Sequence, residues 1–133
     1  MGEPFRHTLR VRYNECDPQG VVFNANYLTY FDLTMTELWR ELGGYQAMVE
    51  SGVDMVVAEV RLRYLAPLRF DDQFEAVVRI AWLSETSMGV EIELVRADQT
   101  IAEGELRYVF IETGGGAKRP IPDPIRDRLS AYL

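Results

Sequence analysis

Asp17 is the residue in this sequence whose surroundings best suit chemistry. It follows a stretch that alternates apolar and polar residues, as strands do, and it precedes a turn that contains Pro18 and Gly20. A helical pattern starts near Asn24, so the sequence predicts a carboxylate beside the free backbone N–H groups of a helix N-terminus. A nucleophile or base that faces an anion-stabilising helix end is suited to acyl transfer.

Other interpretations of this segment compete with that one. An Asp before such a turn also forms Asx turns, in which its side chain accepts a backbone hydrogen bond. Glu15 could pair with the Asp17 carboxylate, although a solvated charge is the favoured interpretation. A thiol nucleophile at Cys16 would need a histidine, and the only histidine, His7, lies about 30 Å away along an extended chain. The same scarcity of histidine argues against a Ser-His-Asp site and a zinc site.

The composition limits the classes of protein to which this chain can belong. Its 133 residues and 47% hydrophobic content predict a single domain, residues 1–133, with a substantial core. A net charge of −7 argues against general nucleic-acid binding, which needs a basic surface. The single cysteine permits no internal disulfide, and we find no signal-peptide pattern and no apolar run of about 20 residues. We therefore expect a soluble cytoplasmic protein with no membrane partner.

Changes in apolar period predict the elements that position the carboxylate. Residues 7–14 alternate as a half-buried strand, and residues 24–42 show the spacing of one long helix. Gly43-Gly44 is a suitable end for that helix. Residues 45–51 and 122–133 predict two short helices. The predicted buried face of the strand holds Leu9, Val11 and Tyr13, and the predicted N-cap of the long helix is Asn24 or Asn26.

Four further stretches alternate as strands do, at residues 55–66, 74–83, 88–95 and 101–111. The links between them are of hairpin length, so we expect an antiparallel meander. Such a sheet would curl around the long helix, which makes the fold class α+β. Its open edges predict dimerisation through edge pairing or helix packing. The predicted inward-facing residues of the last three strands are Phe74, Ala76, Val78, Ile80 and Trp82, then Met88, Val90, Ile92 and Leu94, then Ala102, Gly104, Leu106, Tyr108 and Phe110.

This architecture, together with three sequence segments, resembles the hotdog-fold acyl-CoA thioesterases, in the 4-hydroxybenzoyl-CoA thioesterase-like branch. The resemblance covers nearly the whole chain in the right order, and its first segment is the most specific. It implies an antiparallel sheet wrapped around one long central helix. The matching residues are Arg12, Tyr13, Asp17, Gly20, Val21, Asn26 and Tyr27, then residues 60–67 with Asp71-Asp72, then Thr86-Ser87, Ala102-Glu103-Gly104, Pro120 and Pro122.

The resemblance implies hydrolysis of an acyl-CoA thioester to a carboxylic acid and free CoA. It also implies that the enzyme uses no metal or redox cofactor and forms a homodimer or homotetramer with active sites at the subunit interface. Asp17 would act as nucleophile or general base, the backbone N–H of Asn24 would stabilise the negative oxygen, and Gly20 would let the backbone approach the thioester. Asp32, on the predicted helix, is the second candidate for the catalytic carboxylate.

A further group of residues is expected to bind the substrate. Asn26, Tyr27 and Phe31 lie at the start of the predicted helix, and the resemblance places Ser87 near the thioester. Capping, core packing and a turn hydroxyl are their alternative roles. Basic side chains could bind the CoA phosphates, although exposed strand faces carry arginine in any case. The basic candidates are Arg61 and Arg63, followed by Arg79, Arg96, Lys118 and Arg119.

Two other functions stay open at this point. The first is a thioesterase acting on carrier-protein-bound acyl groups, which the acidic composition disfavours because carrier proteins are acidic as well. The second is a non-catalytic acyl-CoA-binding hotdog protein, which would need no carboxylate at residue 17. A dehydratase with the same fold would need a catalytic histidine paired with an acid, and His7 is poorly placed for that role.

Overall fold

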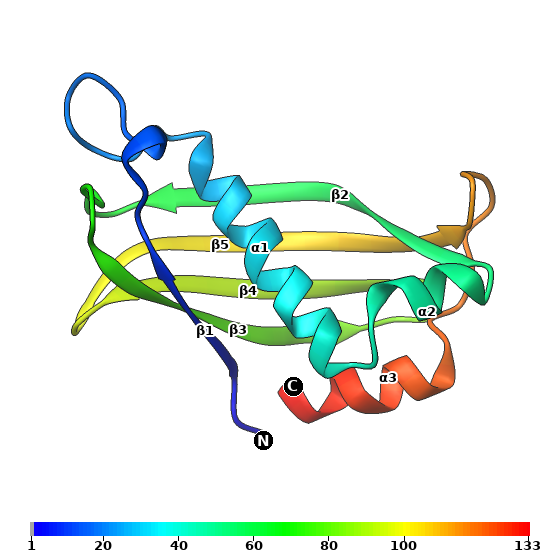
Figure 1. The fold of residues 1–133 in the computed structure, drawn as a ribbon. Helices are drawn as coiled ribbons and strands as arrows, with labels where there is room; N and C mark the ends of the chain where they lie inside the picture. Colours follow the sequence, from blue (N-terminus) through cyan, green and yellow to red (C-terminus); the bar gives the residue numbers. More distant parts are fainter. Residues whose placement is uncertain (1) are drawn as a thin grey trace.

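A five-stranded antiparallel sheet curves around one long helix in the computed structural model, which describes residues 2–133 (Figure 1). The predicted α+β class, with its sheet wrapped around a central helix, is confirmed. No helix within residues 2–133 is long and apolar enough to cross a membrane. The elements are β1 (Phe5–Arg10), α1 (Asn26–Glu41), α2 (Tyr45–Glu50), β2 (Val53–Tyr64), β3 (Gln73–Leu83), β4 (Ser87–Arg96), β5 (Gln99–Glu112) and α3 (Asp123–Leu129), with 3-10 turns at Tyr13–Glu15 and Ser130–Tyr132.

The order of the strands differs from the predicted meander. Hairpins join β3, β4 and β5 as expected, but the order across the sheet is β1-β3-β4-β5-β2, so β2 pairs with β5 rather than with β3. The link between β2 and β3 is not a hairpin turn, because the N–H groups of Leu65 and Ala66 donate to Ile101 and the carbonyl of Leu68 accepts from Val22. With these bonds the link runs past the ends of β5 and β4 to reach β3. The length of the link alone does not show that it crosses two strands.

The apolar faces of α1 and the sheet form the core. The ring of Phe31 packs against Gly104 of β5, where an added Cβ would lie 2.4 Å from the ring. The predicted inward-facing positions are buried, with one exception. Trp82 is 42% exposed because the register shifts between Ile80 and Trp82, which turns the indole to the outer face over Gly89. The buried residues of α1 are Tyr27, Tyr30, Phe31, Thr34, Met35, Leu38 and Trp39.

The first strand is shorter than predicted. β1 ends at Arg10, and Val11 exchanges backbone hydrogen bonds with residues 71–72 instead of continuing along β3. Residues 13–15 then form a 3-10 turn, so Tyr13 is 79% exposed and does not lie on the predicted buried face. The chain therefore leaves the sheet earlier than expected and reaches Asp17 through a separate loop.

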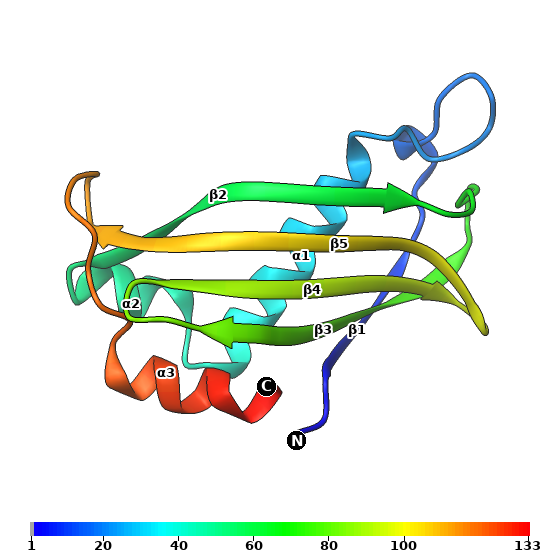
Figure 2. The same cartoon turned by 180° about the vertical axis from the view of Figure 1, so that it is seen from behind.

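The predicted helices are present with small shifts at their ends. α1 begins at Asn26 and has Ala25 at its N-cap position, so neither predicted asparagine side chain caps it. The two short helices predicted from the sequence correspond to α2 and α3. Figure 2 shows that no helix of residues 2–133 covers the outer face of the sheet, on the side opposite to α1.

Candidate active site

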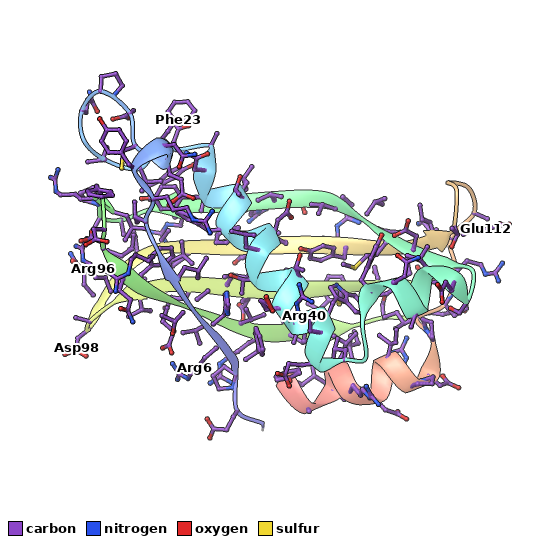
Figure 3. All side chains as sticks on the ribbon, viewed as in Figure 1. Arg6, Phe23, Arg40, Arg96, Asp98 and Glu112 are labelled. Atoms are coloured by element: carbon purple, nitrogen blue, oxygen red, sulfur yellow. The ribbon has the colours of Figure 1, made fainter. Side chains whose placement is uncertain are left out.

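Residues 16–24 form a loop at the end of the sheet where α1 begins. The loop closes on itself, because the N–H of Asp17 donates to Val21 at 2.9 Å and the N–H of Gly20 donates to Asp17 at 2.9 Å. Gly20 has φ +80°, and a Cβ there would meet nothing within 4 Å, so the turn needs glycine for its backbone conformation. Figure 3 shows Phe23, at the end of this loop, beside the first turn of α1.

The Asp17 carboxylate forms the Asx turn considered from the sequence and keeps one oxygen without a partner. Its Oδ1 accepts the N–H of Gln19 at 2.8 Å, which is an Asx turn. Its Oδ2 has no hydrogen-bond partner within residues 2–133, and the residue is half-buried. The Asx turn therefore fixes the carboxylate and leaves one oxygen available for chemistry.

The peptide groups at the start of α1 are held by hydrogen bonds on their carbonyl side. The carbonyl of Phe23 accepts the N–H of Asn26 at 2.9 Å, and the carbonyl of Asn24 accepts the hydroxyl of Tyr64 at 2.9 Å. The N–H groups of Asn24 and Ala25, on the opposite side of the same peptides, have no acceptor within residues 2–133. Two oriented donors at the positive end of a 16-residue helix suit an oxyanion.

Tyr64 is a part of this site that sequence reasoning missed. It ends β2, and its ring packs edge-on against Tyr27 with centroids 5.0 Å apart. Alternation along the strand indicates which face a side chain occupies, but the contact with Asn24 joins residues 40 positions apart. Only the placement of β2 beside α1 brings that hydroxyl to the helix terminus.

Three predicted substrate-binding residues have other contacts in this protomer. The amide of Asn26 donates to the carbonyl of Glu15 at 2.8 Å, which ties the helix to the turn before Asp17. Tyr27 is buried, its hydroxyl accepts the N–H of Leu68 at 3.4 Å, and burial raises its pKa above the usual value. Phe31 is 1% exposed. In this protomer Asn26 and Tyr27 therefore hydrogen-bond neighbouring segments, and Phe31 packs in the core. Their contacts with substrate stay predictions.

Three other predicted binding residues, Ser87, Arg61 and Arg63, belong to strands and not to the Asp17 loop or α1. Ser87 opens β4 at the opposite end of the sheet, where its hydroxyl lies 2.7 Å from that of Ser84. Arg61 and Arg63 of β2 pair in register with Glu105 and Glu103 of β5 and lie with them around a hollow over the outer face of the sheet. The contacts of these three residues with a substrate stay predictions.

The alternative nucleophile and carboxylate also have defined surroundings. The thiol of Cys16 lies 3.9 Å from the carbonyl of Arg12, whereas His7 lies in β1, paired with Ala76. Asp32 is exposed on α1, and its carboxylate makes no hydrogen bond or ion pair within the described residues. No group of three or more His, Cys, Asp or Glu side chains in residues 2–133 is arranged to hold a metal ion.

Comparisons with known proteins identify the family. The family model of the thioesterase-like superfamily matches residues 11–129. The acyl-CoA thioester hydrolase YbgC of Escherichia coli O157:H7 is 31% identical over 91% of this chain and 92% of the relative. The chloroplastic acyl-acyl carrier protein thioesterase ATL3 of Arabidopsis thaliana is 33% identical over 100% of this chain and 71% of its own length.

A solved structure extends the comparison to the fold. The structure of a gentisyl-coenzyme A thioesterase superposes with a TM-score of 0.85 and 25% identity, covering 94% of this chain and 99% of the other. The residues that the family model matches include the loop that carries Asp17, the central helix and all strands after it. The chain therefore belongs to the thioesterase-like superfamily and is a hotdog-fold thioester hydrolase.

Proposed function

We propose that this protein is an acyl-CoA thioesterase that releases a carboxylic acid and free CoA, with Asp17 as nucleophile or general base. The observation that carries the proposal is a fixed carboxylate with one free oxygen on the loop that leads into a helix terminus with two unpartnered N–H groups. The relative named acyl-CoA thioester hydrolase supports the substrate class.

The chemistry needs one attacking oxygen and one stabilised negative oxygen. The free oxygen of Asp17 either attacks the acyl carbon, forming an anhydride that water then hydrolyses, or takes a proton from the water that attacks. The thioester carbonyl oxygen becomes negative and accepts the backbone N–H of Asn24 at the helix end. One such donor contributes about 3–4 kcal/mol of transition-state stabilisation in comparable enzymes. The C–S bond then breaks, and the CoA thiolate leaves and is protonated.

We further propose that the active enzyme is a homodimer or homotetramer. β2 is a 12-residue edge strand, and unpaired edges of this length normally pair or are covered. The exposed apolar side chains along it are Val56, Val57, Val60 and Tyr64. Ser87 opens β4 at the end of the sheet opposite to Asp17, so a second protomer would be needed to bring a residue in that position to the site.

Carrier-protein substrates are the second candidate. The relative named acyl-acyl carrier protein thioesterase favours them, whereas the net charge of −7 disfavours an acidic carrier. Rates on the CoA and carrier-bound forms of one acyl chain decide between the two. A panel of short, long and aryl CoA esters, scored by kcat/KM, defines the acyl group.

Asp17→Asn tests the catalytic assignment with little structural change, because the amide oxygen can still accept the N–H of Gln19. We expect kcat on the best CoA ester to fall by roughly 10³-fold or more, with unchanged thermal unfolding. Asp98→Asn, in the exposed turn between β4 and β5, is the matched control and should keep full activity. Undiminished hydrolysis by Asp17→Asn would refute the role of this carboxylate.

A further inference from the structure

Glu15 connects the Asp17 loop to α1 through both its side chain and its backbone. Its Oε1 accepts the hydroxyl of Tyr30 at 2.8 Å and the N–H of Arg12 at 2.7 Å. Its carbonyl accepts the side-chain amide of Asn26 at 2.8 Å and the N–H of Phe23 at 2.9 Å. One residue is therefore bonded to two side chains of the helix and to the chain on both sides of the loop. We call these four hydrogen bonds the Glu15 clamp.

We propose that Glu15 and Tyr30 are positioning residues for catalysis, and that the Glu15 clamp sets where the Asp17 carboxylate lies relative to the N–H groups at the start of α1. This inference rests on the proposed function. It assigns to Glu15 a task other than the solvated charge expected from the sequence, because the carboxylate is turned toward Tyr30.

Geometry explains why the loop needs this attachment. The bonds between Asp17 and Val21 and between Gly20 and Asp17 fix the shape of the loop, and the N–H of Val22 attaches it to Leu68 in the link between β2 and β3. The Glu15 clamp attaches the side of the loop that carries Asp17 to α1. The Asp17 carboxylate lies two residues beyond Glu15, and the unpartnered N–H groups begin one residue beyond Phe23. The Glu15 carbonyl joins these two points through Phe23, and the side chains of Tyr30 and Asn26 join both to the helix.

The Tyr30 hydroxyl is well placed to hold the carboxylate. Tyr30 is 1% exposed, and Glu15 is its hydrogen-bond acceptor. Hydrogen bonds to an ionised acceptor are stronger than neutral ones. Burial, followed by the bond to Glu15, raises the pKa of Tyr30 well above its usual value, so the phenol stays a donor at physiological pH. The ring itself packs edge-on against Phe74 at 5.0 Å, a contact that phenylalanine would preserve.

Two substitutions break the side-chain bond from its two ends. Tyr30→Phe removes the donor, and Glu15→Ala removes the acceptor. A displacement of about 1 Å at a reacting group can lower the rate by roughly 100-fold, so we expect kcat to fall by about 10- to 100-fold with KM within about twofold. Glu15→Gln keeps an acceptor oxygen and should restore kcat to within about threefold of the unmodified enzyme.

Two further comparisons separate positioning from general support of the fold. In an Asp17→Asn background, Tyr30→Phe should cause no further loss of residual turnover, since the clamp acts through that carboxylate. Tyr108→Phe is the matched control, because Tyr108 is also a buried tyrosine, and its hydroxyl has no hydrogen-bond partner within residues 2–133. This control should leave kcat unchanged.

The outcomes distinguish this inference from the proposed function. Normal kcat in both Tyr30→Phe and Glu15→Ala, with Asp17→Asn inactive, would overturn the clamp and leave the function standing. Full turnover by Asp17→Asn would instead overturn the catalytic role of Asp17. If Tyr30→Phe does not fold, the two Glu15 variants decide: equal kcat values for Gln and Ala at position 15 would contradict the proposal, and rescue by Gln alone would support it.

Discussion

The contact between Phe31 and Gly104 predicts a large effect from a single added methyl group. In Gly104→Ala the new Cβ would lie 2.4 Å and 2.5 Å from two ring atoms of Phe31, roughly 1 Å closer than ordinary contact. Phe31 is 1% exposed, so its ring cannot turn into solvent. Overpacking of this kind lowers the free energy of unfolding by about 1–3 kcal/mol. For a domain of this size we expect the unfolding midpoint to fall by about 3–10 °C.

Thermal and urea unfolding followed by circular dichroism measure this change. Phe31→Leu should relieve the clash, so the double variant should be more stable than the sum of the two single effects by at least about 1 kcal/mol. Gly44→Ala is the matched control: its φ of +99° makes alanine unfavourable, but a Cβ there meets nothing within 4 Å. Phe31→Leu should not rescue that variant. A Gly104→Ala protein as stable as the unmodified one would refute the reasoning.

Three smaller effects follow from other contacts. Tyr64→Phe removes one of the two hydrogen bonds on the Asn24 carbonyl at the start of α1 and leaves the longer one from the N–H of Tyr27. We expect kcat to fall about 5- to 10-fold at constant KM, and unchanged kcat would contradict this. Arg96→Ala removes a half-buried ion pair with Asp72 at 2.7 Å and should lower the free energy of unfolding by about 1–3 kcal/mol. Arg6→Ala removes an exposed pair and should change that free energy by less than about 1 kcal/mol. Equal losses for the two variants in urea unfolding would count against burial as the cause. Burial, followed by a hydrogen bond to a carboxylate, raises the pKa of Tyr45 to about 12 from its ordinary value of 10.0. The folded state therefore holds that proton more tightly, so this contribution to the free energy of unfolding is full below about pH 10 and is lost as the pH rises to about 12. In unfolding experiments at several pH values, Tyr45→Phe should lose less stability between about pH 10 and 12 than the unmodified protein.

Periodicity predicted the parts of the fold whose residues lie close together in the sequence. The inward positions of β3, β4 and β5 and the apolar face of α1 follow local periods of two and 3.6 residues. Trp82 departs from its period because a bulge inserts one residue, and a bulge has no strong sequence signal when no glycine marks it. Tyr13 departs because β1 ends at Arg10, where pairing with the 71–72 segment replaces pairing with β3.

The pairing of β2 could not be predicted in the same way. A link of seven or eight residues is equally compatible with a hairpin and with a crossover past two strands. Only contacts between distant segments, such as Leu65 with Ile101 and Val22 with Leu68, select the crossover. The same reason explains why Tyr64 was not expected at the start of α1.

The two interpretations of Asp17, a turn residue and a catalytic carboxylate, are compatible with one geometry. The Asx turn uses one carboxylate oxygen, and the left-handed conformation of Gly20 closes the loop so that the other oxygen stays free. These features are local, which is why the sequence indicated them. We expect the position of the free oxygen relative to the start of α1 to depend on the contacts that Glu15 and Tyr64 make with residues 15 and 40 positions away. Substitutions at Glu15 and Tyr64 should therefore affect turnover although neither side chain takes part in the Asx turn that holds the carboxylate. Such an effect in a folded variant would show that catalysis needs the loop to be correctly placed as well as correctly shaped.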